Sequence, residues 1–403
     1  MASLAASDFL VIGGGVIGLR VALEAKRRYS DARVTLIDKE ARLGLHASGR
    51  NSGVLHAGFY YTADSFKARF TRDGNARLSQ YCDERRLRIN RCGKLVVAKD
   101  GSELAVLDEL LRRAQRNGVE LQDLSAAQAQ VIEPRAKTHE RALFSPSTAT
   151  VDPAELMASF LKDAEYGGVQ VLTGTAYVGR AGNEVRTSRG RMPVGYVINA
   201  AGLYADRVAR DFGFAQRYRI LPFKGLYLHA APGSYRLRTN IYPVPDLRTP
   251  FLGVHLTVNV DGQVTLGPNA VPALWREQYG IFENFKLEEF LQIVGLEGYM
   301  FVRNRGCFRT IALRELPKYY RPRLVSEAAS LAEGVRGDCF RRWGAAGIRA
   351  QLVDIEKYRL EYDFCLEGDA RSLHVLNAVS PAFTCAIPFA EFVLDEVARL
   401  ASG

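Results

Sequence analysis

The hydrophobic pattern of the first forty residues predicts a βαβ unit. Residues 8–13 (DFLVIG) form a short apolar run that ends in glycines, and a helical pattern follows from Val16 to about Tyr29. A second apolar run, from Arg33 to Asp38, predicts another buried strand. Because the strands are joined through a helix, the connection is a crossover, and we expect the two strands to lie parallel in one sheet.

The regular alternation of strand and helix stops after Asp38. Residues 46–61 (HASGRNSGVLHAGFYY) are rich in small and polar side chains and have neither a helical nor a strand period. Further along, Asp152 caps a predicted helix whose first position is Pro153. The other elements predicted in the first half are helices over 65–90 and 102–117 and strands over 92–100, 168–179 and 184–202.

The second half of the chain is strand-rich from about residue 220. Its alternating pattern and the turn at Asp261-Gly262 predict an antiparallel sheet that contains a hairpin. Residues 284–340 are more helical and polar, with many arginines and aromatics. The chain then closes with a predicted strand, a small-residue turn and a helix, and it contains no internal repeat or low-complexity tract.

Size and composition are those of a soluble globular protein. The 403 residues are enough for one large two-lobed protein or two to three domains, with 47% apolar and 24% charged residues. No uncharged apolar run reaches about 18 residues, the length that a membrane span needs. The first residues (MASLAASDFL) lack a basic region and a long apolar core, so we expect no secretory signal.

Cysteine spacing and net charge limit the partners. Six scattered cysteines without a CxxC pair predict reduced thiols in a cytoplasm, with neither a disulfide framework nor a metal site. The net charge of +10 is spread along the chain, without a basic block or a nucleic-acid motif, so no nucleic-acid partner is expected. A solvated basic surface is the favoured interpretation, and attraction of a small anionic substrate is the second.

The first glycine turn has the G-x-G-x-x-G spacing at Gly13, Gly15 and Gly18. The first glycine permits a tight turn, the second lets a pyrophosphate approach the helix N-terminus, and the third lets helix and strand pack closely. Asp38 ends the next strand, where a carboxylate would accept hydrogen bonds from a ribose. The preceding strand and this acidic residue argue against a plain glycine turn, so we predict a dinucleotide site.

The spacing of the polar turns favours FAD as that dinucleotide. A nicotinamide domain usually continues with regular βα alternation, whereas this alternation breaks after Asp38. A second polar turn, INAAGLYAD at 198–206, comes much later at a strand end. A cofactor contacted by such distant segments is more plausibly FAD in an extended form.

Several blocks of the sequence resemble one family. The chain is similar to L-2-hydroxyglutarate dehydrogenases/oxidases, within the D-amino-acid-oxidase-like FAD-dependent oxidoreductases. The resemblance covers most of the chain and is weakest over 276–340 and at the C-terminal turn. The blocks occur in the family's order: DFLVIGGGVIG, GRNSGVLHAGFYY, CGKLVVA, NAAGLYADRVA, LPFKGLYL, IYPVPDLRTPFLGVHLT, GPNAV and GIRAQLVD.

This resemblance implies a fold of the α/β class with an α+β second lobe. A Rossmann-like FAD-binding domain would be assembled from residues 1–90, 146–220 and 341–403. Residues 91–145 and 221–340 would form a substrate domain on a mostly antiparallel sheet. The implied reaction oxidises a 2-hydroxydicarboxylate to the 2-keto acid, with electrons passing to FAD.

The FAD contacts are predicted to come from the glycine turn, the 48–53 segment, the second polar turn and the turn before the last helix. The dipole of that helix could stabilise negative charge on the flavin at N1–C2=O. Related enzymes usually have small residues there, whereas this chain has Phe383, Cys385 and Pro388, which leaves the flavin environment and the substrate open. We expect Cys385 to be a buried inert thiol. The predicted contacts are Gly13, Gly15, Val16, Ile17, Gly18, Asp38, Lys39, Ser48, Arg50, Asn51, Ser52, Gly53, Val178, Ala200, Ala201, Gly202, Pro381, Ala382 and Thr384.

Oxidation of a 2-hydroxy acid by a flavin needs a base for the hydroxyl proton. Histidine is the usual base, and His56 and His255 lie in the resembling blocks. We favour His255 as the base and His56 as a flavin or substrate contact, while a structural role for either one stays open. His46, His139, His229 and His374 are expected to be structural or on the surface.

The substrate carboxylates need cations or hydroxyl groups. Arg349 in GIRAQ corresponds to a family arginine that could pair bidentately with the 1-carboxylate, although a surface arginine is the alternative. A tyrosine among the distal-carboxylate candidates could instead be a core-edge residue with a satisfied hydroxyl. Those candidates are Lys224, Tyr60, Tyr61, Tyr242 and Arg248.

The leading hypothesis is an FAD-dependent 2-hydroxy-acid dehydrogenase or oxidase. Within the same fold, the alternative is an oxidase of an amino acid, an amine or a specialised-metabolism intermediate. The positive charge alone suggests a third class, a flavin-containing partner or RNA-modifying scaffold. Oxygen, a quinone or a flavoprotein could be the electron acceptor. The basic, aromatic stretch 298–323 is interpreted as ordinary surface, with another substrate pocket or a peripheral membrane contact left open.

Overall fold

The computed structural model describes residues 3–247 and 251–402. The described chain divides into two compact units. Unit 1 contains the residues up to Arg50, Pro153–Leu221 and the residues from Arg349, and unit 2 contains Asn51–Asp152 and Pro222–Ile348. The two later boundaries between the units fall within strands. One lies between Leu221 and Pro222 in β13 (Tyr218–Gly225), and the other lies between Ile348 and Arg349 in β20 (Gly347–Asp354).

The first boundary differs from the predicted one. The first FAD-domain segment was predicted to run to residue 90, whereas residues 51–90 cluster with unit 2. The reason is strand pairing, because β3 (Val54–Leu55) and β4 (Ile89–Asn90) both pair antiparallel with β8 (Ala149–Val151). The polar segment therefore begins in one unit and ends in the other.

The sheet of unit 1 has a parallel centre, as predicted. β1 (Ser7–Ile12) pairs parallel with β2 and β12, β2 pairs parallel with β9, and β12 pairs parallel with β23. Antiparallel partners extend its edges. The spatial order is β10 (Tyr177–Ala181), β11 (Glu184–Thr187), β12 (Gly190–Asn199), β1, β2 (Val34–Ile37) and β9 (Gln170–Leu172), with β23 (Ser372–Asn377) also pairing with β12 and β22 (Cys365–Gly368) pairing with β23.

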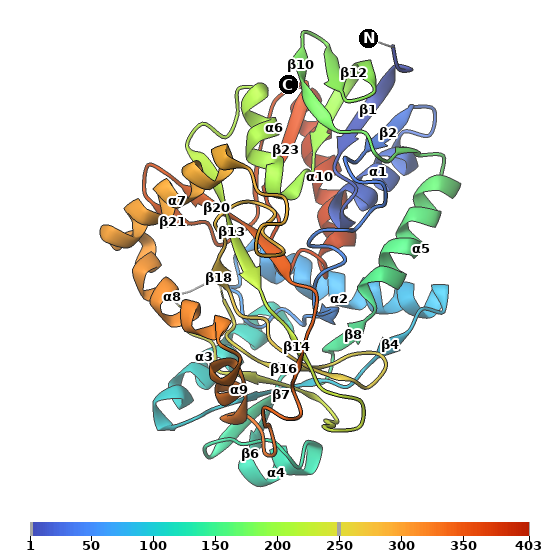
Figure 1. The fold of residues 1–403 in the computed structure, drawn as a ribbon. Helices are drawn as coiled ribbons and strands as arrows, with labels where there is room; N and C mark the ends of the chain where they lie inside the picture. Colours follow the sequence, from blue (N-terminus) through green and yellow to red (C-terminus); the bar gives the residue numbers. More distant parts are fainter. Residues whose placement is uncertain (1–2, 248–250, 403) are drawn as a thin grey trace. The chain divides into compact units, whose positions relative to one another are not determined.

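The helix after the glycine turn, α1 (Val16–Arg28), packs against α5 (Pro153–Tyr166) and α10 (Ala386–Ala401), as Figure 1 shows. Its first amide is satisfied by a side chain, because Val16 N donates to Ser48 Oγ at 2.9 Å. Its last turn contains basic side chains, which interact favourably with the negative C-terminal end of the helix dipole. The buried stripe of α10 includes Phe389, Val393 and Val397 at four-residue spacing. Unit 1 also contains η2 (Gly202–Tyr204) and α6 (Ala205–Asp211).

The large sheet of unit 2 is mostly antiparallel, with one parallel pair between β5 and β15. The predicted hairpin at Asp261-Gly262 is confirmed, since β16 and β17 pair from Val258 with Val264. The order is β19 (Arg342–Trp343), β14 (Leu228–His229), β17 (Val264–Leu266), β16 (Leu256–Val258), β15 (Asn240–Pro243), β5 (Lys94–Val97), β7 (Arg141–Ser145) and β6 (Gln122–Ser125). In a smaller sheet, β13 pairs with β18 (Val271–Pro272), and β20 pairs with β21 (Arg359–Leu360).

The two faces of the large sheet bury different clusters. Leu95 and Val97 of β5 join Ile241 and Leu256 in one hydrophobic cluster. The alternate residue Val96 joins a second cluster, which includes Phe59, Tyr60 and Val244. Because side chains alternate along a strand, the even-numbered positions of β5 and β15 share one face. That face carries the candidate chemistry.

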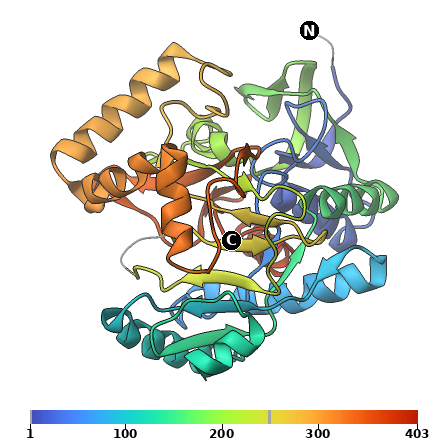
Figure 2. The same ribbon diagram turned by 60° about the horizontal axis from the view of Figure 1, so that its bottom comes forward.

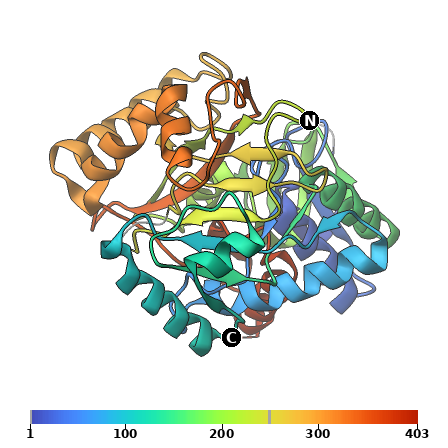
Figure 3. The same ribbon diagram turned by 90° about the horizontal axis from the view of Figure 1, so that it is seen from below.

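Unit 2 also contains helices. Figure 3 shows α2 (Phe66–Arg85, blue) and α3 (Leu104–Asn117, teal), and Figure 2 shows α7 (Leu287–Val302), α8 (Phe308–Glu315) and α9 (Arg321–Ala329) in orange. The helix predicted over 65–90 ends earlier, because Arg86 adopts a left-handed conformation with φ 55°. α4 (Ala126–Ile132) is capped by Ser125. Among the described residues, no helix combines the length and the apolar character that a membrane crossing requires.

Candidate active site

The glycine turn of unit 1 is closed by direct backbone packing. A Cβ on Gly13, where φ is 108°, would lie 2.4 Å from Ala200 O, and one on Gly18 would lie 1.8 Å from Gly13 O. Both positions therefore exclude larger residues. Gly15 differs, since the only described atom within 4 Å of its Cβ position, beyond its chain neighbours, is Ser48 Oγ at 3.1 Å. The helix N-terminus is thus approachable at Gly15.

Asp38 holds this turn in place. Its Oδ2 accepts a hydrogen bond from Gly14 N at 2.6 Å, and its Oδ1 accepts one from Glu40 N at 2.8 Å. A carboxylate has about four acceptor positions, so these bonds leave capacity for a ribose hydroxyl. The sequence prediction for Asp38 as a ribose contact remains a prediction.

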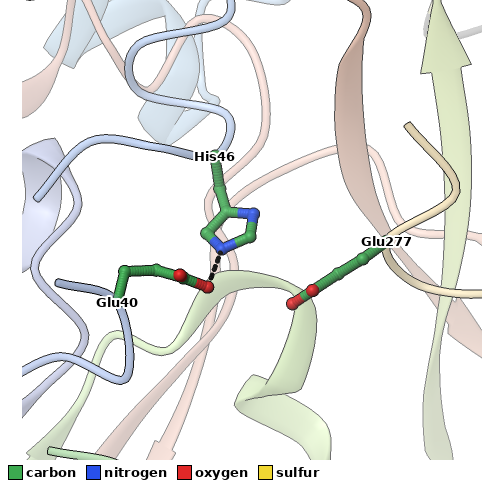
Figure 4. Close-up of side chains that lie close together, drawn as sticks. All are labelled: Glu40, His46 and Glu277. Carbon is green, nitrogen blue, oxygen red and sulfur yellow. Dashed lines mark hydrogen bonds and ion pairs between the residues drawn. The ribbon is translucent and has the colours of Figure 1, made fainter. Parts of the chain in front are cut away.

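Lys39 belongs to a polar cluster beside Asp38. Its Nζ contacts Glu40 and lies 3.2 Å from His46 Nε2. His46 Nε2 lies 2.9 Å from Glu40 Oε1, and Figure 4 draws this pair. Burial opposes ionisation of Glu40, but the bonds from Lys39 and His46 outweigh it and hold the pKa of that carboxyl below its ordinary value. His46 therefore has a structural partner, as expected.

The segment from Ser48 to Gly53 uses its polar side chains to shape its own backbone. Ser48 Oγ accepts from Val16 N, and Arg50 Nε donates to Leu45 O at 2.7 Å. Asn51 Oδ1 accepts from Gly53 N at 2.8 Å, and Gly53 has φ 68°. These bonds explain the small and polar composition. Ser52 is partly exposed.

The later predicted FAD contacts lie at two strand ends and on one edge strand of unit 1. Ala200 N donates to Ile12 O at 2.9 Å, so the 200–202 turn directly follows the pairing of β1 with β12. Pro381, Ala382 and Thr384 lie in the turn before α10, where Thr384 and Cys385 are fully buried. Ile17 is buried in α1 and Val178 of β10 is 59% exposed.

These features fit a bound FAD. The first turn of α1 contains no acidic side chain of its own, which favours an anionic ligand at the positive end of the helix dipole. Positions for a Cβ are open at Gly202 and nearly open at Gly15, which allows close approach of a ligand. The donor set and the small-residue turns are those that a dinucleotide pyrophosphate needs.

Unit 2 brings both predicted catalytic histidines to one tyrosine. The rings of Tyr242 and His255 stack with centroids 3.8 Å apart and planes 18° from parallel. The His56 ring meets Tyr242 edge-on, with centroids 6.5 Å apart. The register that pairs Ile241 with Leu256 places Tyr242 opposite His255, which explains the stack.

Hydrogen bonding assigns the tautomer of His255. Its Nδ1 lies 2.8 Å from Gly253 O. A carbonyl oxygen only accepts, so Nδ1 carries the proton and Nε2 of the neutral ring carries the lone pair. His255 is 5% exposed and His56 is 8% exposed. His255 therefore has the fixed tautomer that a base requires.

A lysine that the sequence prediction missed lies beside this group. Lys94 Nζ is 4.9 Å from the Tyr242 ring centroid and 4.5 Å from that of Tyr60. Lys94 and Tyr242 are fully buried and Tyr60 is 6% exposed, and burial raises the pKa of both phenols. The signal was present in the sequence, because CGKLVVA places a charge at an inward-facing strand position beside Val96.

The remaining substrate candidates lie on several other segments of the chain. Lys224 of β13 is 8% exposed; burial lowers its pKa, and the charge of Glu283 opposes that shift. Tyr61 is partly exposed with Lys67 Nζ 5.9 Å from its ring centroid. Arg349 is partly exposed in β20 and belongs to unit 1. Arg248 lies outside the described residues.

Three other histidines have local neighbours. His374 is fully buried, with Nδ1 3.1 Å from Asn199 Nδ2 and Nε2 3.1 Å from Ser372 Oγ. His229 Nδ1 lies 3.1 Å from Thr265 Oγ1, and His139 Nε2 lies 3.3 Å from Glu140. These neighbours agree with the structural or surface roles expected from the sequence.

A family model described as FAD dependent oxidoreductase matches residues 8–354, which include the glycine turn and both candidate histidines. The chain belongs to this family. It is an oxidoreductase with FAD as its cofactor, so the predicted cofactor is confirmed.

The relatives of this FAD-dependent oxidoreductase match it over nearly its full length. The L-2-hydroxyglutarate dehydrogenase of Salmonella houtenae is 37% identical, over 98% of this chain and 93% of that protein. The mitochondrial L-2-hydroxyglutarate dehydrogenase of Homo sapiens is 34% identical, over 98% of this chain and 89% of that protein. The resemblance stated from sequence blocks is confirmed.

Solved structures of more distant proteins share the fold. An L-alpha-glycerophosphate oxidase from Mycoplasma pneumoniae with FAD bound has a TM-score of 0.75 at 21% identity, covering 100% of this chain and 96% of that chain. A glycine oxidase from Geobacillus kaustophilus has a TM-score of 0.72 at 18% identity, covering 98% and 95%. The predicted fold class is confirmed for this oxidoreductase.

Proposed function

We propose that this FAD-dependent oxidoreductase oxidises a 2-hydroxy acid resembling L-2-hydroxyglutarate to the 2-keto acid. The observation that carries the proposal is the near full-length match to dehydrogenases named for that substrate. The local geometry supports it, since His255 has a lone pair at Nε2 as a base for a hydroxyl group needs.

The proposed oxidation breaks two bonds of the substrate, Cα–H and O–H, and passes the hydride and the proton to different acceptors. Bound FAD supplies the hydride acceptor at its N5 atom. His255 Nε2 takes the hydroxyl proton as the C–O bond becomes a carbonyl, and Nδ1 keeps its bond to Gly253 O throughout. The stacked Tyr242 ring keeps the imidazole plane fixed. His56, at the edge of the same tyrosine, is proposed to contact substrate or flavin.

Substrate binding is assigned to cations and phenols. Arg349 is proposed to hold the 1-carboxylate through a bidentate pair of charge-assisted hydrogen bonds. Lys224, with Tyr60, Tyr61 or Tyr242, is proposed for the distal carboxylate. The low exposure of Lys224 supports this role, because a buried ammonium gains most from an anionic partner.

FAD is proposed to lie along unit 1. The start of α1 with Gly13, Gly15 and Ser48 would hold the pyrophosphate, and Asp38 the ribose. The start of α10 would face the flavin ring with the positive end of its dipole. The residues of unit 1 are therefore the proposed FAD-binding domain and those of unit 2 the proposed substrate domain.

Anaerobic reduction of the bound flavin tests the function. The purified yellow protein is mixed with L-2-hydroxyglutarate, with its D enantiomer as the stereochemical control, and with a panel of amino acids. Bleaching of the flavin band by the L enantiomer alone is expected. Bleaching by amino acids but by no hydroxy acid would establish the alternative oxidase, and a colourless protein that retains nucleic acid at high salt would refute both.

We also propose a cytoplasmic protein with a peripheral membrane contact, where a quinone could serve as acceptor. Support comes from exposed apolar side chains of unit 2, some of them next to basic residues in the chain. Ile281 and Phe282 are each 81% exposed, Val302 is 73% exposed, and the neighbouring Arg303 and Arg305 are exposed. Oxygen and another flavoprotein remain alternative acceptors.

A further inference from the structure

Lys94 is a buried lysine for which no counter-ion lies among the described residues. Its side chain is 0% exposed, and among the described residues its Nζ has no hydrogen-bond partner. Three aromatic rings surround this nitrogen instead. The distances from Nζ to the ring centroids are 4.6 Å for Phe59, 4.5 Å for Tyr60 and 4.9 Å for Tyr242.

This environment disfavours a lysine on grounds of stability alone. An ammonium removed from water without a partner is costly, and attraction to aromatic faces offsets only part of that cost. Burial accordingly lowers the pKa of Lys94 to about 7. A leucine or methionine would fill the same strand position, beside Val96, without this penalty. The lysine therefore calls for a role other than packing.

Tyr242 links Lys94 to the proposed base. The same ring lies within 4.9 Å of Lys94 Nζ and 3.8 Å, centroid to centroid, from the His255 ring. Strand pairing sets both relationships, because β5 and β15 pair in parallel from Asn240 with Lys94, and β15 and β16 pair at Ile241 and Leu256. Lys94 and Tyr242 thus share one face of a rigid sheet.

We propose that Lys94 is a positioning residue that acts on His255 through the Tyr242 ring. It holds the ring against the imidazole, and in its charged form it disfavours protonation of His255, so that the base stays able to accept a proton. The inference deepens the proposed function and rests on it for the identity of the base. Lys94 need not touch the substrate for this role.

The other titratable groups around Lys94 are few. Tyr60 and Tyr61 come from the segment after β3, His56 from the same segment, and Cys92 precedes Lys94 in the chain. Burial raises the pKa of the Cys92 thiol to about 11, and the Tyr60 and Tyr242 phenols are likewise held neutral. The strand neighbours of Lys94, Ser145 and Asn240, do not titrate. Lys94 itself therefore changes charge near neutral pH, because burial lowers its pKa to about 7.

The test replaces Lys94 by methionine in the full-length, FAD-loaded protein. Lys94→Met keeps the length of the side chain and removes the charge. We expect an equal or higher melting temperature and unchanged FAD content. We expect kcat to fall roughly tenfold to a hundredfold, as for a displaced catalytic group, with little change in KM. The acidic limb of the kcat pH profile should move to higher pH.

A second readout does not depend on turnover. In protein with isotope-labelled histidine, the NMR titration midpoint of the His255 ring should move to higher pH in Lys94→Met. In a Tyr242→Leu background the same substitution should cause a smaller shift, because the ring that Lys94 positions is absent. Lys94→Gln, read in the same way, replaces the methionine variant if that variant does not fold.

Lys318 gives the matched control. It is also buried, but its Nζ lies 2.8 Å from Glu315 and 3.1 Å from Glu327. Lys318→Met should lower the melting temperature and leave the pH profile unchanged. Normal kcat together with an unmoved His255 titration in Lys94→Met would overturn the inference. If wild-type flavin is reduced by no hydroxy acid, the proposed function fails instead, while the NMR titration still decides the link between Lys94 and His255.

Discussion

The Tyr242 ring stacks on the His255 imidazole at a centroid distance of 3.8 Å, with 18° between the planes. This contact places an aromatic surface against the proposed base and, with the bond from Nδ1 to Gly253 O, leaves the ring one orientation. The stack comes from strand register, and the hydrogen bond comes from the nearby backbone. A histidine held in this way is suited to the proton transfer that we propose for it.

Replacing the base should slow turnover sharply. His255→Asn keeps a donor near Gly253 O and removes the basic nitrogen, so we expect kcat to fall by about 10²–10⁴-fold. His56→Asn serves as the comparison and should cause a smaller loss. Stopped-flow flavin reduction measures both. Near-normal rates in the two variants would show that neither histidine is the base.

Arg349 should contribute to binding more than to the rate of the chemical step. Arg349→Ala removes a charge-assisted contact, so KM for a carboxylate substrate should rise by a factor equivalent to about 1.5–3 kcal/mol. Steady-state kinetics measure the effect. Arg359→Ala is the control, because Arg359 is exposed in β21 and lies 3.8 Å from Glu361. An unchanged KM in Arg349→Ala would remove this residue from the site.

Glycine substitutions should separate cofactor binding from folding. A methyl group at Gly15 meets only Ser48 Oγ, so Gly15→Ala should lower FAD affinity while the apoprotein keeps its melting temperature. Gly18→Ala places a Cβ 1.8 Å from Gly13 O and should destabilise the fold itself. At Gly298 in α7 no described atom beyond the helix's own nearby backbone and chain neighbours lies within 4 Å of the Cβ position, so Gly298→Ala should stabilise the protein by about 0.5–1 kcal/mol.

These three effects need two measurements, flavin content by absorbance and melting temperature without flavin. The comparison fails if Gly15→Ala retains FAD as tightly as the wild type. It also fails if Gly15→Ala and Gly18→Ala lose stability to the same extent.

Stability should fall in mild acid because of His374. Burial lowers the pKa of this histidine from 6.5 to about 4, with Asp369 opposing the shift and Arg180 adding to it. Asn199 Nδ2 donates to Nδ1, so protonation there would break a buried hydrogen bond. Between pH 6.5 and about 4 this histidine binds a proton in the unfolded chain but not in the folded chain. The free energy of unfolding therefore decreases as pH falls.

The histidine's share of that decrease is at most about 3 kcal/mol. Urea unfolding of wild type and His374→Gln at pH 7.5 and 5 isolates it, since the variant should lose less stability between the two pH values. His139→Gln, an exposed site, should behave like wild type. Parallel losses in all three proteins would contradict this origin.

The membrane proposal predicts binding to vesicles. Ile281→Ser with Phe282→Ser removes two side chains that are each 81% exposed, and binding to vesicles containing anionic lipid should weaken in a flotation assay. Val131→Ser is the control, since Val131 is 76% exposed on α4. Equal flotation of both variants and the wild type would argue against this surface.

Local patterns were enough for much of the fold. The βαβ start, the Asp261-Gly262 hairpin and the closing helix follow from periodicity and turn residues that act over a few positions. The assignment of residues 51–90 to unit 2 could not be predicted from local patterns. Their place in unit 2 depends on Val54 and Asn90 pairing with the same strand, about sixty residues further along the chain from Asn90.

The sequence by itself determined the glycine turn, because Gly13 and Gly18 are required by contacts within a single βαβ unit and its neighbouring strand. It also determined the family and FAD, since blocks of residue types recur in order. Only the tertiary structure decided that Tyr242 stacks on His255 and that Lys94 lies beside Tyr242. Those contacts depend on the register between β5, β15 and β16, and the pairing of β5 with β15 joins positions about 150 residues apart. The hydrophobic period of a strand predicts which face of the sheet a side chain lies on. The pairing of strands determines which other side chain it contacts.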